Sequence, residues 1–330
     1  MLTAALVLSL AASAEVAVLS SQNDVAELRF QPLGAAELVP PVARFSHAEG
    51  SAVKGSLLPR SRVVVASATM FPGGDLSFAN SLIRLEAGKS PRVLADQLVY
   101  GSRPLVTAEG RVFVSRGVAG LEPVDGRDAL RVDALSIEEI DPTTAARRVV
   151  YSSAGYLTFL AGALGRELII YEVAPLGARL IAVHADTFAV RELLHAMAPL
   201  GRDFVVDAPR HRVLFTQGVA DRWLVEQVDL ITGASSRLAE GAEVTLTPAV
   251  LSDGRVLLNR GEGLRTLEGA PVFPANGRGF ERVSFQQKNL IVGLLQRPSD
   301  FPVLFAVKDG ATQVLAAPSQ SRLDVAGVIP

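Results

Sequence analysis

Residues 250–261 read VLSDGRVLLNRG, which has the form of a strand, an Asp-Gly turn and a second strand. An Asp-Gly pair between two apolar runs is a strong signal for a β-hairpin. Related stretches recur along the chain, so this hairpin is one copy of a repeat. The other copies are AEGRVFVSRG (108–117), PRHRVLFTQG (209–218), PRSRVVVAS (59–67), GRELIIY (165–171) and KNLIVG (288–293).

Most copies are followed by a second hairpin, in which apolar and polar residues alternate around a turn rich in Asp, Thr and Gly. Such alternation is typical of strands with one face buried. The repeat is therefore a unit of four strands. A Val or Leu marks each copy at 63, 112, 168, 213, 256 and 290, at intervals of roughly 35 to 55 residues, close to the usual length of a propeller blade.

The two ends of the chain are each incomplete as a blade, and each supplies what the other lacks. Residues 321–329 read as one strand with no blade after it, whereas residues 15–45 offer three strands with no first strand before them. We therefore predict an all-β fold: a seven-bladed β-propeller of four-stranded antiparallel blades, closed by N- and C-terminal strands that share one blade. Residues 15–330 are expected to form this single domain, with the other blades beginning near 52, 99, 156, 200, 242 and 280.

Composition limits the classes of function. The chain has 330 residues and a net charge of −2, which gives no reason to expect nucleic-acid binding. It contains no cysteine, which excludes disulfides, thiolate metal sites and cysteine nucleophiles. The Ala-, Arg- and Leu-rich, Lys-poor composition indicates a GC-rich bacterial genome.

The first residues read MLTAALVLSLAASAEV, with an apolar run over residues 2–10 and an Ala-x-Ala cleavage site at 12–14. We predict that residues 1–14 are a signal peptide that lacks the usual basic n-region; the alternative is a hydrophobic first strand. No later segment approaches ~18 unbroken apolar residues, so no transmembrane helix is expected in the mature chain. The expected location is the periplasm or the extracellular space.

The sequence SDGRVLL (252–258) resembles the S-P-D-G-[KR]-x-[IL]-x-[FW] core of the WD-like repeats in Tol-system periplasmic propellers. The turn at 228–233 resembles the turn before the fourth strand of those repeats. This chain lacks the Pro of the motif, and an aliphatic residue mostly replaces its closing aromatic. The resemblance implies a propeller that binds other envelope proteins and has no enzymatic activity.

Polar residues follow the second strand of several repeats, at turns expected to face the mouth of the central funnel. They are Arg116, Glu172, Gln217 and Arg260. We predict that these four residues form a rim that binds a ligand or peptide, with Arg116 and Arg260 contacting an anionic group. The predicted function is therefore that of an exported, monomeric, non-enzymatic propeller. It binds an envelope or extracellular protein or peptide across its funnel face.

The alternative function is that of a propeller hydrolase or lyase acting on a sugar, lactone or ester in the funnel, with Glu172 and His184 as candidate residues. The sequence has no G-x-S-x-G nucleophile motif, and we assign no catalytic residues, cofactor or metal. Two metal alternatives stay open. One is a site shared by His184 and His195, and the other is calcium bound by the acidic insertion at 118–135.

Overall fold

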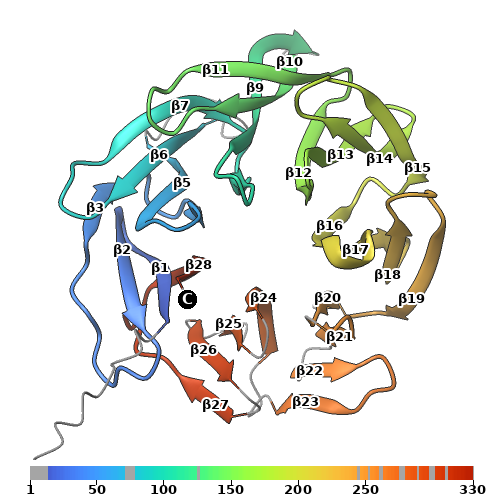
Figure 1. The fold of residues 1–330 in the computed structure, drawn as a ribbon. Coiled ribbons are helices and arrows are strands. Elements are labelled where there is room, and N and C mark those ends of the chain that lie inside the picture. The colour runs from blue at the N-terminus through green and yellow to red at the C-terminus, as the bar shows by residue number, and fades with distance from the viewer. Residues whose placement is uncertain are drawn as a thin grey trace, which may run out of the picture.

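The computed structural model describes residues 14–70, 79–124, 127–243, 246–251, 253–259, 263–274, 279–287, 290–296, 302–308 and 311–329. The helical element among these residues is one 3-10 turn, η2 (Ala208–Arg210), and every other regular element is a strand. Figure 1 shows the strands grouped into sheets around a ring. No helix in this part of the chain has the length and apolar character needed to cross a bilayer. Residues 1–13 lie outside the described residues, so the signal peptide stays a prediction.

The two ends of the chain meet in one sheet, the closing sheet, with the order β28-β1-β2-β3. Its strands are β28 (Arg322–Ile329), β1 (Glu15–Gln22), β2 (Val25–Pro32) and β3 (Ala43–Ser46). β28 runs antiparallel to β1 near the centre of the ring, with Ser21 opposite Arg322 (Figure 1). The shared sheet predicted from the two incomplete ends is confirmed, and it closes the ring.

The next strands form one eight-stranded sheet. Seven of them follow the order β11-β10-β9-β7-β6-β5-β4, and β8 pairs with β9. The strands are β4 (Lys54–Leu57), β5 (Val63–Thr69), β6 (Asn80–Glu86), β7 (Arg92–Leu98), β8 (Leu105–Val106), β9 (Val112–Val124), β10 (Arg127–Ile140) and β11 (Arg147–Ser153).

Four further sheets of four strands each complete the ring. Two of them comprise β12 (Leu157–Leu164), β13 (Glu167–Ala174), β14 (Gly177–His184) and β15 (Val190–Met197), then β16 (Gly201–Asp207), β17 (Arg212–Val219), β18 (Arg222–Asp229) and β19 (Ser235–Gly241). The other two comprise β20 (Thr247–Val250), β21 (Val256–Asn259), β22 (Gly263–Thr266) and β23 (Pro271–Pro274), then β24 (Gly279–Gln287), β25 (Leu290–Gln296), β26 (Val303–Lys308) and β27 (Ala311–Val314).

The propeller class is confirmed, but the prediction of seven four-stranded blades is wrong. Among the described residues the structure has five four-stranded blades, and the strands from β4 to β11 are joined in the eight-stranded sheet instead. β9 continues beyond β8, and its Arg116 pairs with Leu98 at the end of β7. The Val99 N–H also donates to Ser115 O at 3.0 Å. A repeat count locates strands along the chain, but it does not show whether neighbouring units are bonded edge to edge.

The hairpin at 250–259 has the local chemistry that its sequence indicates. The Leu251 N–H donates to Arg255 O at 2.8 Å, and Asp253 Oδ1 accepts from the Arg255 N–H at 3.0 Å. Gly254 has φ of 92°, a conformation that glycine adopts without steric cost. Ser252 lies outside the described residues.

The core lies between neighbouring sheets. All seven residues of β5 are buried, which is typical of a strand with packing on both faces. One cluster packs Leu19 and Leu28 of the closing sheet against Val64 of β5, and another packs Tyr171 of β13 against Phe215 of β17. Because each sheet buries its faces against its neighbours, the ring is the unit of stability.

Strand direction divides the connections between two faces of the ring. The second and fourth strands of a four-stranded antiparallel sheet end at the same edge. The turns after second strands and the connections from fourth strands to the next sheet therefore share one face, which we call the funnel face. Among the described residues its connections include 23–24, 47–53, 99–104, 154–156, 175–176, 198–200 and 220–221.

Candidate functional site

Arg116 lies on β9 beside the end of β7. Its guanidinium donates to Glu138 Oε1 at 2.7 Å, to Asp96 O at 2.6 Å and to Gln97 Oε1 at 3.2 Å. Only 13% of the side chain is exposed. Arg116 is therefore bonded within the eight-stranded sheet, where it holds the last residues of β7.

Glu172 on β13 is more enclosed, with 1% of its side chain exposed. Its Oε1 accepts hydrogen bonds from Ser153 Oγ at 2.6 Å and from Gly155 N at 3.0 Å. Its Oε2 accepts from Tyr151 OH at 2.7 Å and from Arg179 Nη2 at 2.9 Å. These donors come from β11, the connection after β11, and β14, so Glu172 fixes the path of the chain into the next sheet.

These contacts keep Glu172 ionised. Burial would raise the pKa of its carboxyl, but the hydrogen bonds from Ser153, Tyr151 and Arg179 outweigh burial and hold the pKa below its ordinary value. Burial, reinforced by the hydrogen bond to this carboxylate, raises the pKa of Tyr151 to about 12. Near neutral pH the two groups are therefore a carboxylate and a phenol. Neither has a pKa near 7, which is where general acid–base catalysis is most effective.

Gln217 lies near the end of β17, and 7% of the residue is exposed. Its Oε1 accepts from Ala198 N at 3.0 Å, and its Nε2 donates to Glu226 Oε2 at 2.7 Å. It therefore ties the connection between β15 and β16 to its own sheet. Arg260, the fourth predicted rim residue, lies outside the described residues.

The three described rim residues lie within β9, β13 and β17, and not at the turns after these strands where they were predicted. Glu172 and Gln217 are each bonded to a neighbouring connection, whereas Arg116 is bonded to the end of β7. All three are supports for the surrounding structure and not an open binding rim. The sequence pattern predicts that polar residues stand near the ends of these strands. It does not show whether a polar side chain faces water or is hydrogen-bonded to the backbone of a connection.

The histidines proposed as metal ligands have other contacts. His184 Nδ1 accepts from Asp186 N at 3.3 Å and from Thr187 N at 3.2 Å, so it shapes the turn after β14. His195 pairs with Glu192 on its own strand. Within the part of the chain that the structure describes, no group of three or more His, Asp or Glu side chains is placed to hold a metal ion. The acidic insertion includes Asp125, which lies outside that part, so calcium binding there stays an untested alternative.

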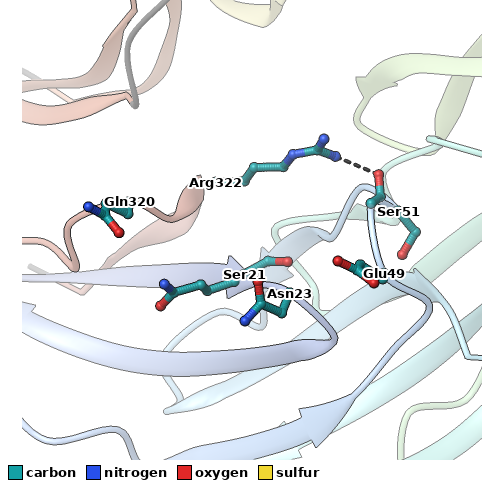
Figure 2. A pocket seen from close by; sticks show the side chains of 8 residues that line it. Ser21, Asn23, Glu49, Ser51, Gln320 and Arg322 are labelled. Carbon is teal, nitrogen blue, oxygen red and sulfur yellow. Dashed lines mark hydrogen bonds between the residues drawn. The ribbon is translucent and has the colours of Figure 1, made fainter.

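Two adjoining pockets open where the closing sheet meets β4. One has a volume of about 310 Å³, and the residues around it include Ser21, Asn23, Glu49, Ser51, Gln320 and Arg322. In Figure 2 the Arg322 side chain reaches from β28 toward the loop that carries Glu49 and Ser51. The second, which we call the seam pocket, has a volume of about 360 Å³ and is lined in part by Leu19, Val53, Lys54, Pro302, Arg322 and Leu323. Ser21 and Arg322 border both.

Ser21 is hydrogen-bonded to a buried histidine. Its Oγ lies 2.8 Å from His47 Nε2, and His47 Nδ1 lies 2.8 Å from Ala48 O. Because a carbonyl oxygen can only accept, Nδ1 carries a proton, and in the neutral imidazole Nε2 therefore accepts from the Ser21 hydroxyl. Sequence reasoning missed this pair, since the two residues share no motif. The predicted closing sheet was the signal that could have placed them together.

A third pocket, of about 500 Å³, lies between the eight-stranded sheet and the β12–β15 sheet, on the opposite face. Its charges are paired: Arg111 Nε lies 2.7 Å from Glu139 Oε1, and Arg111 Nη1 lies 3.0 Å from Asp186 Oδ1. The hydrogen bond from Arg111, with a second from Arg148, lowers the pKa of Glu139 despite its partial burial. These ion pairs connect the two neighbouring sheets.

Large apolar side chains are exposed on the funnel-face connections after β7, β11, β13 and β15, and on the strands β9 and β17. We call this set the apolar arc; it consists of Tyr100, Val118, Tyr156, Leu176, Leu200 and Val219. Their exposed fractions run from 41% for Tyr100 to 102% for Leu176. The closing sheet has the polar residues Asn23, Glu49 and Gln320 on its connections to the same face. The funnel face is therefore apolar over one part and polar over another.

Two of the described rim residues support members of the apolar arc. Glu172 accepts from the N–H of Gly155, which precedes Tyr156, and Gln217 accepts from the N–H of Ala198, two residues before Leu200. The Gly218 N–H donates to Leu200 O at 3.1 Å, which joins that connection to the end of β17. Val25, which is 39% exposed, follows the funnel-face connection 23–24 of the closing sheet. The remaining exposed apolar residues lie on outer strands or on turns of the opposite face, where Ile231 is an example. The arc is thus held in place by buried polar groups beneath it.

Comparison with known proteins identifies the fold. No family model and no curated protein matches the sequence. Among solved structures, TolB from Acinetobacter baumannii is similar at a TM-score of 0.52 and 10% sequence identity, over 94% of this chain and 67% of TolB. The chain has a TolB-like propeller fold. The resemblance to Tol-type propellers is thereby confirmed at the level of the fold.

Other solved propellers match equally well. A puromycin-hydrolysing peptidase from Mycobacterium tuberculosis has a TM-score of 0.55 and 13% identity, over 91% of this chain and 53% of the peptidase, so this chain spans about half of that protein. A chain of the nidogen–laminin complex has a TM-score of 0.50 and 12% identity, over 95% of this chain and 98% of that one. At such identities the likeness establishes the fold alone.

Proposed function

We propose that this protein binds another protein or a peptide across its funnel face, without catalysing a reaction. The observation that carries the proposal is the apolar arc. Large apolar side chains exposed on one face of a domain support a protein interaction site there, and aromatic anchors such as Tyr100 and Tyr156 contribute strongly to such sites. A chain of similar fold takes part in the nidogen–laminin complex, which supports use of the fold for protein binding.

The proposed partner is an envelope or extracellular protein. The expected signal peptide at 1–14 and the TolB-like fold support a location in the periplasm or outside the cell. Because the ring closes within one chain through β28 and β1, the proposed active form is a monomer. In this account Glu172 and Gln217 contribute by fixing connections that carry the arc, Arg116 by holding the end of β7, and Arg260 is proposed as part of the same rim.

The test is affinity capture from cross-linked envelope of the native organism, read by mass spectrometry. We expect a reproducible partner that is lost with Leu176→Glu and with Leu200→Glu, since each places a charge in the interface. The matched control is Ile231→Glu, because Ile231 is 66% exposed but lies on the opposite face. A partner captured equally by all three variants, or no reproducible partner, would overturn the proposal.

One observation favours a second function, ester hydrolysis. Ser21 Oγ lies 2.8 Å from His47 Nε2 beside two pockets, and with a neutral imidazole this is the relation of a nucleophile to its general base. Under this alternative a fluorophosphonate probe should form one adduct, on Ser21, that Ser21→Ala abolishes. Ser20→Ala is the control, because Ser20 lies on the same strand but accepts from Arg29 Nη1 at 2.9 Å instead. Absence of an adduct would reject hydrolysis at this site.

A further inference from the structure

The pocket of about 310 Å³ beside the closing sheet, which we call the serine pocket, has a polar lining. Among the described residues around it, every one except Gly50 has a polar or charged side chain. They come from the end of β1 and the turn after it, from the connection after β3, and from the segment that leads into β28 (Figure 2). Its volume is at the lower end of the range for small-molecule sites. The pocket therefore suits a small ligand with many polar groups.

Two serines of this pocket are buried and are bonded to the same histidine. Ser21 is 8% exposed and Ser51 is 7% exposed. Ser21 Oγ lies 2.8 Å from His47 Nε2, and Ser51 Oγ lies 3.0 Å from His47 Nδ1. Because Nδ1 carries a proton, Ser51 Oγ accepts from it, and the Ser51 hydroxyl proton is left to be donated. In the neutral imidazole Ser21 gives its proton to Nε2, so its oxygen is left to accept.

His47 thus gives the two serines opposite roles toward a ligand. Within the described part of the chain, no protein acceptor takes the Ser51 hydroxyl proton. A buried donor without an acceptor costs free energy, which a ligand oxygen at this position would recover. The serine pocket therefore presents a donor at Ser51 and an acceptor at Ser21, both held by a buried ring.

The outer part of the serine pocket has charged groups of both signs. Glu49 forms no ion pair within the described ranges. Arg322 Nη1 donates to Gly50 O at 2.5 Å, which leaves the other N–H groups of the guanidinium for a ligand. An anionic ligand would meet the Glu49 carboxylate and a cationic ligand would meet Arg322, so the lining favours a neutral ligand.

We propose that the serine pocket binds a neutral sugar. Each sugar hydroxyl both donates and accepts, which matches a lining where the amides of Gln22, Asn23 and Gln320 also carry donors and acceptors. The planar ends of amide, carboxylate and guanidinium groups can each bond two adjacent hydroxyls. None of the described lining residues is aromatic, so binding depends on hydrogen bonds that compete with water. We therefore expect a dissociation constant on the order of 1 mM.

This inference goes beyond the proposed function. The serine pocket lies on the polar part of the funnel face, and none of its described lining residues belongs to the apolar arc. The two proposals can therefore fail separately. Leu200→Glu should abolish capture of the protein partner and leave sugar binding unchanged.

The test is saturation-transfer NMR with the methyl glycosides of glucose, galactose and mannose. The counterpart is tetrahydropyran-2-methanol, which keeps the ring and lacks its hydroxyls. We expect at least one glycoside to bind, and the counterpart not to bind. Asn23→Gly removes an amide at a position where φ is 54°, which glycine tolerates, and should weaken binding about three- to tenfold.

Ser51→Ala should weaken glycoside binding by the same factor, because it removes the donor while Ala48 O still accepts from His47 Nδ1 at 2.8 Å. The matched control is Ser102→Ala, which should leave binding unchanged. Ser102 is 8% exposed, and its hydroxyl donates to Val99 O at 2.6 Å in another connection of the funnel face. Circular dichroism of each variant checks that the fold is kept.

Several results would overturn the inference. One is that no glycoside binds, and another is that tetrahydropyran-2-methanol binds equally well. A third is that neither Asn23→Gly nor Ser51→Ala weakens binding. Displacement of the glycoside by an equal concentration of glycine would also overturn it, since the pocket would then take a zwitterion and not a sugar.

Discussion

Replacement of Glu172 by Gln should destabilise the fold more than any loss of a surface charge. The carboxylate accepts from Ser153 Oγ, Gly155 N, Tyr151 OH and Arg179 while 1% exposed. An amide keeps one acceptor oxygen and turns an NH₂ group toward donors. Breaking a buried ion pair by removing one partner costs about 3–5 kcal/mol, and because Arg179 is partly exposed we expect the lower end, about 3 kcal/mol.

The same substitution has a signature in pH. The folded-state pKa of Glu172 lies below its ordinary value, so its stabilisation is complete above the unfolded-state pKa and is lost as pH falls through the folded-state pKa. The difference in unfolding free energy between wild type and Glu172→Gln should therefore stay constant from pH 7 to about pH 5 and shrink below about pH 4.

The measurement is urea denaturation followed by circular dichroism, at several pH values. The control is Glu240→Gln, since Glu240 is an exposed carboxylate that pairs with Arg222 at 2.8 Å, and such pairs contribute about 1 kcal/mol or less. A difference for Glu172→Gln below about 1 kcal/mol, or one that does not change with pH, would refute the assignment of this residue as a buried ionised support.

Two predictions concern the closure of the ring. Gly55→Ala would place a Cβ against Leu19 Cδ1 and 3.1 Å from Val64 Cγ1, in the core between the closing sheet and β4. We expect a loss of about 1–3 kcal/mol by chemical denaturation, and an unchanged midpoint would contradict this packing. Asp324→Asn leaves Arg103 without its buried counter-charge and should cost about 2–3 kcal/mol, with faster hydrogen exchange confined first to β1, β4 and β28. Exchange that accelerates equally in all sheets would show that Asp324 does not hold this seam.

The four-stranded repeat and the sheet shared by the two chain ends could be predicted from the sequence, because both depend on local chemistry. Turn residues followed by β-branched runs mark each second strand, and the unmatched strand at each end predicts the shared sheet. The joining of two neighbouring repeats by backbone hydrogen bonds into one eight-stranded sheet could not be predicted. It depends on how far β9 continues past β8 and on the single pairing of Leu98 with Arg116, which no turn signal encodes.

The rim residues were predicted at turns after second strands, but Arg116, Glu172 and Gln217 lie within β9, β13 and β17. They bond to groups distant in sequence, Arg116 to the end of β7 and the other two to connections, which the sequence does not show. The apolar arc was missed as a set, since its members lie far apart in the sequence, on separate connections and strands. Only the antiparallel order of the strands brings them to one face. The pair of Ser21 and His47 was missed for the same reason.

The account is tested most directly by a photoreactive amino acid placed at one position of each face in living cells. Leu200 represents the apolar arc and Ile231 the opposite face; both are more than half exposed. We predict that irradiation yields a specific cross-linked complex from position 200 and none from position 231. Equal cross-linking from the two positions, or a complex formed only from position 231, would contradict binding across the funnel face.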